Sequence, residues 1–226
     1  MPTQSPKIRL NKFLAERLGV SRREADDLIS KGEITVDNQP AVLGTRIDKK
    51  SKVLYKDKPV SFENEYIYLA FHKPVGYVCS RRAQGDAPTL YELLPKEYHK
   101  LKTVGRLDKN SSGLILLTND GDFAFQMTHP KFRKTKVYEV ELDRPLEPLH
   151  QQMISEYGVM LDDGPSQFKV IRDSKQYIVT LTEGRNRQIR RTFAALGYKV
   201  TKLHRTNFGK YELNGLEPGK CVIIEP

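Results

Sequence analysis

The segment GRLDKNSSGLILLTND, residues 105–120, decides the fold. Its apolar run LILL predicts a buried strand. The Asn-Ser-Ser step before this run favours side-chain to backbone turns, and Gly113 permits a positive φ. Asp108 precedes that step, so it is either a plain turn former or a functional acid, because scaffolds present reactive groups on loops that adjoin a rigid strand. An arginine two residues before the acid favours the functional interpretation.

A second segment adds a cluster of basic side chains. TEGRNRQIRRTFAALG, residues 182–197, predicts a helix that Asn186 caps and a glycine ends. Arg187, Arg190 and Arg191 would share one face of this helix, where they need phosphates or a carboxylate opposite them. The alternative is an ordinary solvated face.

The remaining C-terminal two thirds of the chain are rich in short strands. The stretches YIYLAFHKPVGYV, VYEVEL, FKVI, YIVTL and CVII are composed mainly of β-formers. Residues 149–157 and 186–196 have helical periodicity. In KTKVYEVEL, residues 134–142, Tyr138 lies on one face of a strand, where a tyrosine either packs in the core or stacks on a base. We expect an α+β domain over residues 64–226, built on a mostly antiparallel, mixed sheet with flanking helices.

The N-terminal residues predict a separate, small basic module over residues 7–58. Two short helices are expected, the second starting at Ser21 with Glu24 completing a capping box. Arg22 and Arg23 occupy the first turn, where the helix dipole disfavours cations, so phosphate docking explains them better than stability does. A charged, proline-containing linker is expected at residues 55–65.

Composition limits the function classes. The chain has 226 residues and a net charge of +10, which favours a polyanionic partner, nucleic acid above all, over a merely soluble basic protein. No run approaches the length of a membrane span, and the first ten residues have no signal-peptide core, so a cytoplasmic protein without membrane contact is expected. Cys79 and Cys221 predict neither a disulfide nor a zinc site.

Several catalytic signatures are missing from the sequence. It has no glycine-rich dinucleotide loop, no phosphate-binding loop, no paired metal-ligand histidines and no serine nucleophile elbow. The five histidines are dispersed. Chemistry based on nucleotides or metals is therefore not expected.

Residues Arg9 to Asn38 resemble the ribosomal protein S4-type RNA-binding domain. The matched pattern is an R-L-x-x-F-L step, then S-R-x-x-A, and then G-x-I-x-V before a turn. The resemblance implies that five basic residues contact RNA: Arg9, Lys12, Arg22, Arg23 and Lys31.

The rest of the chain resembles the bacterial ribosomal RNA pseudouridine synthases, the family of small-subunit synthase A and large-subunit synthases B, E and F. The resemblance rests on GRLDKNSSGLILLTNDGD, KVYEV, EGRNRQIRRTFAALG and HKPVG, in which His72 replaces the usual asparagine. It implies isomerisation of uridine within RNA, in a site-specific reaction that needs no cofactor. The implied partner is ribosomal RNA or a pre-ribosomal particle, and a monomer is expected.

The resemblance also implies residue roles. Asp108 is the essential carboxylate, acting either as nucleophile or as base, and Arg190 is the basic residue that pairs with it. Tyr138 stacks on the target uracil, and Arg106 fills the gap left when the target nucleotide flips out. Leu203 lines the pocket, and Arg187 contacts the RNA.

Two other functions compete with this one. A non-catalytic ribosome-assembly factor on the same fold would use the Asp108 turn only as structure, but the joint presence of Asp108, Tyr138 and Arg190 argues against it. A methyltransferase is disfavoured because the glycine-rich nucleotide loop is missing.

Overall fold

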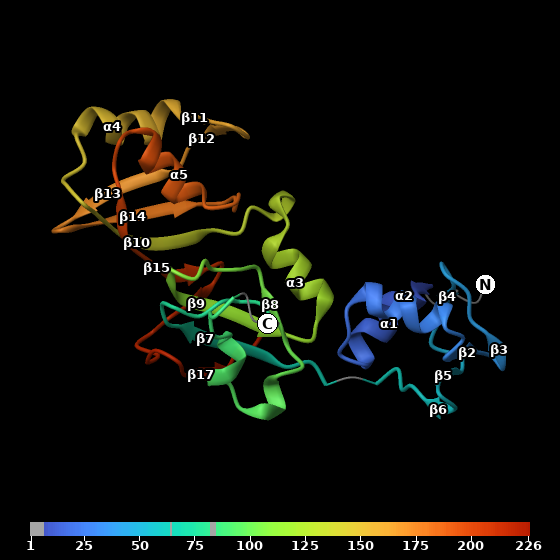
Figure 1. Cartoon of the computed structure of the whole chain (residues 1–226). Helices are drawn as coiled ribbons and strands as arrows, with labels where there is room; N and C mark the ends of the chain where they lie inside the picture. Colours follow the sequence, from blue (N-terminus) through green and yellow to red (C-terminus); the bar gives the residue numbers. More distant parts are fainter. Residues whose placement is uncertain (1–6, 64, 82–84) are drawn as a thin grey trace. The chain divides into compact units, whose positions relative to one another are not determined.

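The computed structural model describes residues 7–63, 65–81 and 85–226 (Figure 1). The chain divides into two compact units. The first comprises Met1–Ile67 with Asn119–Gly121, and the second comprises Tyr68–Thr118 with Asp122–Pro226. Each unit has its own buried apolar core.

The first unit packs two helices against short strands. Its core is formed by apolar side chains of both helices and of the strands, including Phe13, Leu14, Ile29 and Ile34. One two-stranded pair joins β1 to β4, and a four-stranded sheet has the order β3-β2-β5-β6. The elements are β1 (Ile8–Arg9), α1 (Leu10–Arg17), α2 (Arg22–Ser30), β2 (Ile34–Val36), β3 (Gln39–Pro40), β4 (Arg46–Ile47), β5 (Val53–Tyr55) and β6 (Lys58–Pro59).

Helix α2 begins at the capping box that the sequence predicts. The Ser21 hydroxyl accepts a hydrogen bond from the Glu24 amide at 3.1 Å, and the Glu24 carboxylate accepts one from the Ser21 amide at 2.7 Å. These two bonds satisfy amide groups that the first turn otherwise leaves unpaired. Arg22 and Arg23 follow in that first turn, and both are exposed.

The expected linker at residues 55–65 starts too early. Its first residues belong to the β5–β6 hairpin, whose turn residues Lys56 and Asp57 have φ values of 48° and 63°. A two-residue turn of this kind needs two positive φ angles, which glycine and asparagine signal more clearly than lysine does. The β2–β3 turn similarly uses Asp37 and Asn38, with φ values of 51° and 65°, directly after the G-x-I-x-V pattern.

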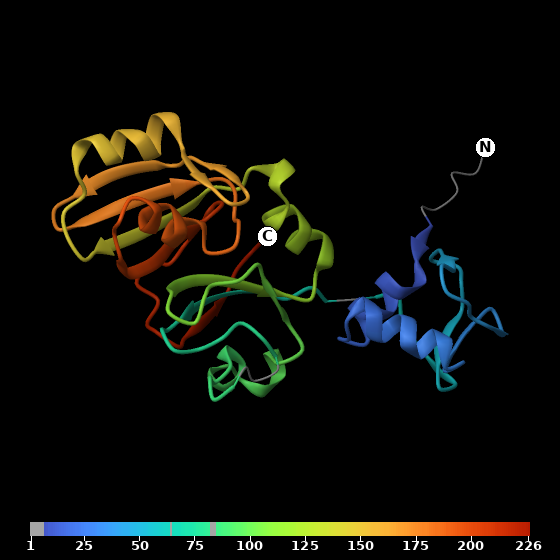
Figure 2. The same cartoon turned by 45° about the horizontal axis from the view of Figure 1, so that its top comes forward.

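The second unit is built on a nine-stranded mixed sheet, which confirms the α+β class (Figures 1 and 2). The strand order is β13-β14-β10-β15-β9-β7-β17, with β16 added to β15 and β8 added to β9. Strands β9 and β15 run parallel, and the other recorded pairs are antiparallel. The strands of this sheet are β7 (Tyr68–Lys73), β8 (Lys102–Val104), β9 (Ser112–Thr118), β10 (Lys136–Leu142), β13 (Lys169–Asp173), β14 (Gln176–Leu181), β15 (Val200–Phe208), β16 (Tyr211–Glu212) and β17 (Cys221–Ile223).

Helices and a small hairpin complete the second unit. Figure 2 shows α4 and α5 beside the half of the sheet that contains β10, β13 and β14. The additional elements are η1 (Leu90–Leu93), η2 (Lys96–Tyr98), α3 (Gly121–Thr128), η3 (Pro130–Phe132), α4 (Pro148–Gln152), η4 (Met153–Tyr157), β11 (Val159–Leu161), β12 (Gly164–Ser166) and α5 (Gln188–Ala195). The predicted helix at 149–157 is thus one α-helical segment followed by a π-helical turn. Within the described ranges, no helix is both long enough and apolar enough to cross a membrane.

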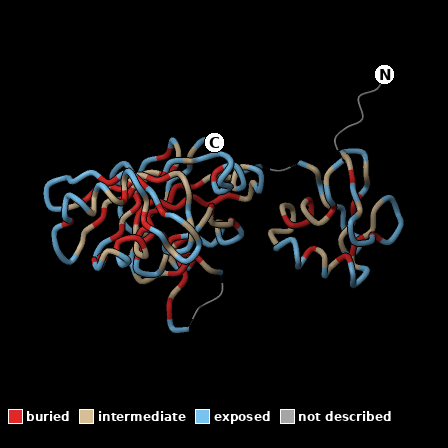
Figure 3. Tube along the Cα trace, turned by 90° about the horizontal axis from the view of Figure 1, so that it is seen from above, coloured by how far each residue is buried: buried red, intermediate tan, exposed pale blue. Residues whose placement is uncertain are grey.

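Strand β9 confirms the buried strand predicted from LILL. Its residues Leu114, Ile115, Leu116 and Leu117 are all fully buried, so both faces of the strand are covered. Figure 3 shows that buried and exposed stretches alternate along much of the chain. Burial on both faces removes the alternation that marks a half-exposed strand, and the sequence accordingly shows a continuous apolar run.

Gly113 lets β9 and β15 approach each other. It has a φ of +106°, and a Cβ atom there would lie 2.2 Å from the Arg205 carbonyl oxygen. Gly113 is paired with Arg205, and Ser112 with His204, across this parallel contact. The contact brings the turn before β9 next to the middle of β15.

Candidate active site

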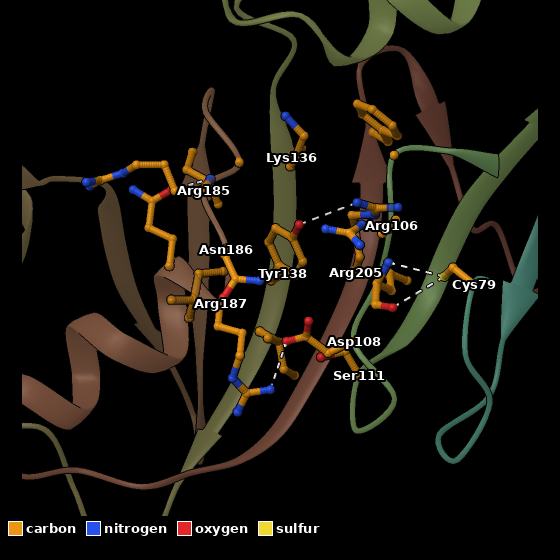
Figure 4. A pocket seen from close by; sticks show the side chains of 18 of the residues that line it. Cys79, Arg106, Asp108, Ser111, Lys136, Tyr138, Arg185, Asn186, Arg187 and Arg205 are labelled. Carbon is orange, nitrogen blue, oxygen red and sulfur yellow. Dashed lines mark hydrogen bonds and ion pairs between the residues drawn. The ribbon is translucent and has the colours of Figure 1, made fainter. Parts of the chain in front are cut away.

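A cavity of about 670 Å³ opens in the second unit between the turn before β9, the faces of β10 and β15, and the segment before α5 (Figure 4). Five residues singled out in the sequence line it, although they come from four different parts of the chain: Arg106, Asp108, Tyr138, Arg187 and Leu203.

Lys73 stabilises the turn that carries Asp108 by hydrogen bonds to backbone carbonyls. The Ser111 amide donates to the Asp108 carbonyl at 3.0 Å and closes the turn. The Lys73 ammonium donates to three carbonyl oxygens, those of Asp108 (3.1 Å), Ser111 (2.7 Å) and Pro74 (3.0 Å). Lys73 is fully buried, and this burial lowers its pKa to about 8. The polar residues therefore build the turn, and the Asp108 carboxylate remains free to face the cavity.

Cys79 holds the same turn from the side. Its thiol donates to the Leu107 carbonyl and accepts from the Leu107 amide, both at 3.3 Å. Burial raises the pKa of this thiol. Leu107 lies between Arg106 and Asp108, so the two bonds fix the backbone between these side chains.

Asp108 forms its ion pair with Arg187. The Nη1 atom of Arg187 lies 3.3 Å from Oδ2 of Asp108. Both side chains are partly exposed, at 47% for Arg187 and 32% for Asp108. Arg187 precedes α5 as its N-cap residue, with a left-handed φ of 47°. The helix therefore starts later than predicted. Its N-cap is Arg187 in place of the predicted Asn186, so Arg187 lies before the helix and not on its surface.

Arg190, expected to pair with Asp108, instead contacts the backbone of the turn. Its guanidinium donates to the carbonyls of Asn110 (2.7 Å) and Val200 (2.9 Å), and it lies 3.4 Å from the Ser111 hydroxyl. No ion pair between Arg190 and Asp108 is recorded in the described chain. Burial and the neighbouring Arg187 lower the pKa of Arg190. The guanidinium of Arg190 is already occupied by three oxygens, the Asn110 and Val200 carbonyls and the Ser111 hydroxyl. Arg190 therefore holds the turn and does not pair with the carboxylate.

Asp163 holds the segment before α5. Arg185 donates to its carboxylate at 2.9 Å, and Arg191 donates to the other carboxylate oxygen at 2.8 Å. The carboxylate holds the pKa of Arg191 above its usual value, and Arg191 holds that of Asp163 below its usual value. The three arginines predicted on one helix face thus have three different sets of partners, and the loop carrying Arg187 is fastened to the β11–β12 turn.

Tyr138 forms part of the cavity wall from β10. Its side chain is 8% exposed, and the Arg205 guanidinium lies 3.5 Å from its hydroxyl and 6.0 Å from its ring centroid. Arg205 is almost fully buried, and its Nε donates to the Leu114 carbonyl at 2.7 Å. Its Nη2 atom is buried and has no hydrogen-bond partner among the described residues. This N–H is available to an acceptor on a bound molecule.

Cys79, Lys136 and Arg205 are among the cavity residues that sequence reasoning did not predict. Lys136 is 9% exposed, and burial together with Arg205 lowers its pKa to about 8. The signal that could have found the two basic residues is strand alternation. Lys136 stands two residues before Tyr138, and Arg205 stands two residues after Leu203, so each pair shares a strand face. Cys79 gave no comparable signal.

Arg106 lies at the cavity with an exposed side chain (Figure 4). Its position, two residues before Asp108 and after the end of β8, places a guanidinium at the opening. No carboxylate partner is recorded for it within the described residues, so it presents a positive charge to an incoming polyanion.

The basic residues of the first unit are distributed over α1 and both ends of α2. Arg9 is the N-cap of α1 and Lys31 the C-cap of α2. The Arg22 guanidinium lies 3.4 Å from the Asn11 side-chain oxygen, which brings it beside the turn of α1 that contains Lys12. Arg9, Arg22, Arg23 and Lys31 are exposed, and Lys12 is half-buried.

Comparison with known proteins assigns the class. Residues 67–195 match the family model described as RNA pseudouridylate synthase, and residues 8–53 match the S4 domain. The chain belongs to the RNA pseudouridylate synthase family, with an S4 domain at its N-terminus, as its resemblance implied. It is an enzyme of that class.

Particular relatives agree with this class. The chain is 36% identical over 213 residues to ribosomal small subunit pseudouridine synthase A of Pasteurella multocida (strain Pm70), covering 92% of this chain and 91% of the relative. It is also 36% identical over 231 residues to ribosomal large subunit pseudouridine synthase B of Yersinia pestis, covering 96% of this chain and 72% of the relative. A crystal structure of a pseudouridylate synthase superposes with a TM-score of 0.69 at 33% identity, covering 96% of both chains.

Proposed function

We propose that the protein isomerises specific uridines to pseudouridine in ribosomal RNA, either free or within a pre-ribosomal particle. The observation that carries the proposal is the pairing of the Asp108 carboxylate with Arg187 at a cavity whose wall contains Tyr138. The curated relatives named above, a small-subunit and a large-subunit enzyme, support ribosomal RNA as the substrate at equal identity.

The reaction rearranges atoms within one nucleotide. The bond between N1 of uracil and C1′ of ribose breaks, the uracil turns, and a bond forms between C5 and C1′. The proton on C5 is lost and N1 becomes protonated, so no atom is gained overall. Such an isomerisation needs no electron carrier and no energy source.

In this proposal Asp108 is the catalytic group. It acts by one of two routes, as a nucleophile on the nucleoside or as a base at the ribose. Arg187 orients the carboxylate through a charge-assisted contact, and Arg190 positions the turn through the Asn110 carbonyl. Tyr138 stacks on the target uracil, Leu203 lines the pocket beside it, and an acceptor on the base meets the free N–H of Arg205.

The remaining basic residues bind the RNA. A base inside a helix cannot reach a cavity, so the target nucleotide flips out and the exposed Arg106 fills the gap that it leaves. Residues 7–58 act as the RNA-binding domain through Arg9, Lys12, Arg22, Arg23 and Lys31, and residues 64–226 act as the catalytic domain. The working protein is a cytoplasmic monomer in this proposal.

Mapping of pseudouridine in ribosomal RNA tests the proposal. Purified protein, added without cofactor to ribosomal RNA from cells lacking the gene, should create pseudouridine at a defined site. Asp108→Asn should abolish the product while its affinity for the RNA stays within about twofold of the wild type. Asp173→Asn is the matched control, because Asp173 is an exposed carboxylate on β13 that does not line the cavity.

Two results would count against the proposal. Full activity of Asp108→Asn would remove Asp108 from catalysis. Tight RNA binding by the wild type without any pseudouridine formation would favour the non-catalytic assembly factor instead.

A further inference from the structure

An exposed aromatic cluster lies at the end of α3 and in η3. Phe125 and Phe132 are 45% and 38% exposed, and their rings meet edge to face with centroids 5.8 Å apart. The His129 ring lies 4.7 Å from Phe125 and 6.4 Å from Phe132. Large aromatic side chains that stay exposed side by side are a feature of binding surfaces. We call Phe125, His129 and Phe132 the aromatic patch.

Positive charge surrounds the aromatic patch. The Lys131 ammonium lies 5.2 Å from the Phe125 centroid and 4.7 Å from the Phe132 centroid. Between Asp122 and Glu139 the chain contains four basic residues and no acidic one: Lys131, Arg133, Lys134 and Lys136. No ion pair is recorded for these four within the described ranges. Lys136 is buried in the cavity wall, whereas Lys131 and Arg133 are exposed and Lys134 is half-buried, so these three present their charge beside the patch.

The segment that carries the patch is held in one shape. The His129 ring nitrogen accepts a hydrogen bond from the Lys131 amide at 3.2 Å, and the Arg133 amide donates to the Pro130 carbonyl at 3.0 Å. Arg133 then turns the chain with a φ of 47°. A surface fixed before binding loses less entropy when a ligand docks.

The patch adjoins the catalytic cavity along the chain. Thr128, the residue before His129, lines the cavity, and so does Lys136, two residues after Lys134. Nucleotides that neighbour a flipped uridine in the cavity can therefore reach the patch.

We propose that the aromatic patch stacks an unpaired base of the same RNA strand, near the target uridine, while Lys131, Arg133 and Lys134 contact the phosphates beside it. This inference rests on the proposed function. Aromatic faces stack on any base, and basic side chains next to them neutralise the backbone, which is the common combination in single-strand recognition. Three basic residues at the surface, without an acid among them, suit the phosphates of a nucleic-acid strand.

Removal of the stacking face should weaken RNA binding. Phe132→Ala should raise the Kd for ribosomal RNA from cells lacking the gene by about tenfold, since stacking on one base contributes about that factor. The KM for pseudouridine formation should rise similarly, with kcat changed less than twofold. Phe132→Tyr keeps the ring and should retain wild-type affinity. Tyr157→Ala is the matched control, because Tyr157 is 74% exposed and does not line the cavity.

Salt dependence separates stacking from charge. Phe132→Ala should leave the slope of log Kd against log salt unchanged, whereas Lys131→Gln should reduce that slope by about one. If Phe132→Ala does not fold, Phe132→Leu retains the apolar bulk without a π face and should show the same loss.

The outcomes distinguish this inference from the proposed function. Folded Phe132→Ala or Phe132→Leu with a Kd within twofold of the wild type would overturn the stacking role, even if the wild type makes pseudouridine. Equal losses in Phe132→Tyr and Phe132→Ala would also overturn it. An inactive wild type would refute the proposed function, and the comparison of Kd values would still decide the stacking role.

Discussion

The Lys73 ammonium donates a hydrogen bond to the backbone carbonyl of Asp108, with 3.1 Å between the two atoms. The donor is fully buried, so its charge is stabilised by carbonyl dipoles in place of water. The acid at the cavity is therefore positioned through its own backbone by a cation that substrate never touches.

Lys73→Met should destabilise the protein and impair the turn. The three carbonyls that Lys73 satisfies would be left unpaired, at an expected total cost of about 3 kcal/mol in the free energy of unfolding. Urea unfolding at pH 7 measures this cost, and RNA binding by the folded fraction is the control. An unchanged unfolding free energy would show that the hydrogen bonds of Lys73 do not stabilise the turn.

The pKa of Lys73 predicts a pH dependence of stability. In the folded protein this pKa is lowered to about 8 from 10.5, so the folded state releases the proton first as pH rises. Between pH 8 and 10.5 the unfolded state binds more protons, and the contribution of Lys73 to the unfolding free energy rises by up to about 1.4 kcal/mol per pH unit. The difference in unfolding free energy between the wild type and Lys73→Met should grow accordingly over this range. A flat difference would contradict the lowered pKa.

Alanine substitutions of Arg187 and Arg190 should have different effects on kcat and on thermal stability. Arg187→Ala removes the partner of the Asp108 carboxylate and should lower kcat about a hundredfold, with little loss of stability because the side chain is half exposed. Arg190→Ala removes the bonds to the Asn110 and Val200 carbonyls, so it should lower the melting temperature as well as kcat. Single-turnover rates and thermal melts of both variants test this. Near-normal kcat in Arg187→Ala, combined with a severe loss in Arg190→Ala at normal stability, would return the pairing role to Arg190.

Gly113→Ala should disrupt the β9–β15 contact. Its Cβ would lie 2.2 Å from a backbone oxygen that cannot move aside, and alanine rarely adopts a φ of +106°. We expect a loss of about 3 kcal/mol or failure to fold. Gly215→Ala provides the control, since that position also has a positive φ but nothing lies within 4 Å of the added Cβ.

The first turn of α2 should contribute to RNA affinity. Arg22→Ala combined with Arg23→Ala should weaken binding and reduce the salt slope of log Kd by about two, one for each lost phosphate contact. Retention of the capping box keeps α2 folded, which circular dichroism can check. A salt slope equal to that of the wild type would exclude a phosphate-docking role.

Local features were predictable from the sequence, and long-range ones were not. The capping box of Ser21 and Glu24 lies within four residues, and the LILL run is apolar throughout, so α2 and β9 were predicted correctly. The parallel pairing of Gly113 with Arg205 joins segments about ninety residues apart and leaves no periodic signal. Composition and periodicity predicted only the strands and helices of the second domain. Its assignment to the pseudouridine synthases came from the family resemblance.

The candidate site shows the same limit on a smaller scale. Asp108, Tyr138 and Arg106 carry motif signatures and do line one cavity. Arg187 lies just before α5, which starts at Gln188, and from a left-handed backbone conformation its side chain reaches the acid. Helical periodicity alone does not signal this placement of Arg187.

The insertion of β15 between β9 and β10 has a consequence for the timing of synthesis. The acid and the tyrosine are both made before residue 140, but the cavity wall opposite them is Val200–Phe208. A nascent chain that has not yet released this strand holds two unsatisfied sheet edges and no substrate cavity. The cavity is therefore complete only when this late strand lies between the two earlier ones.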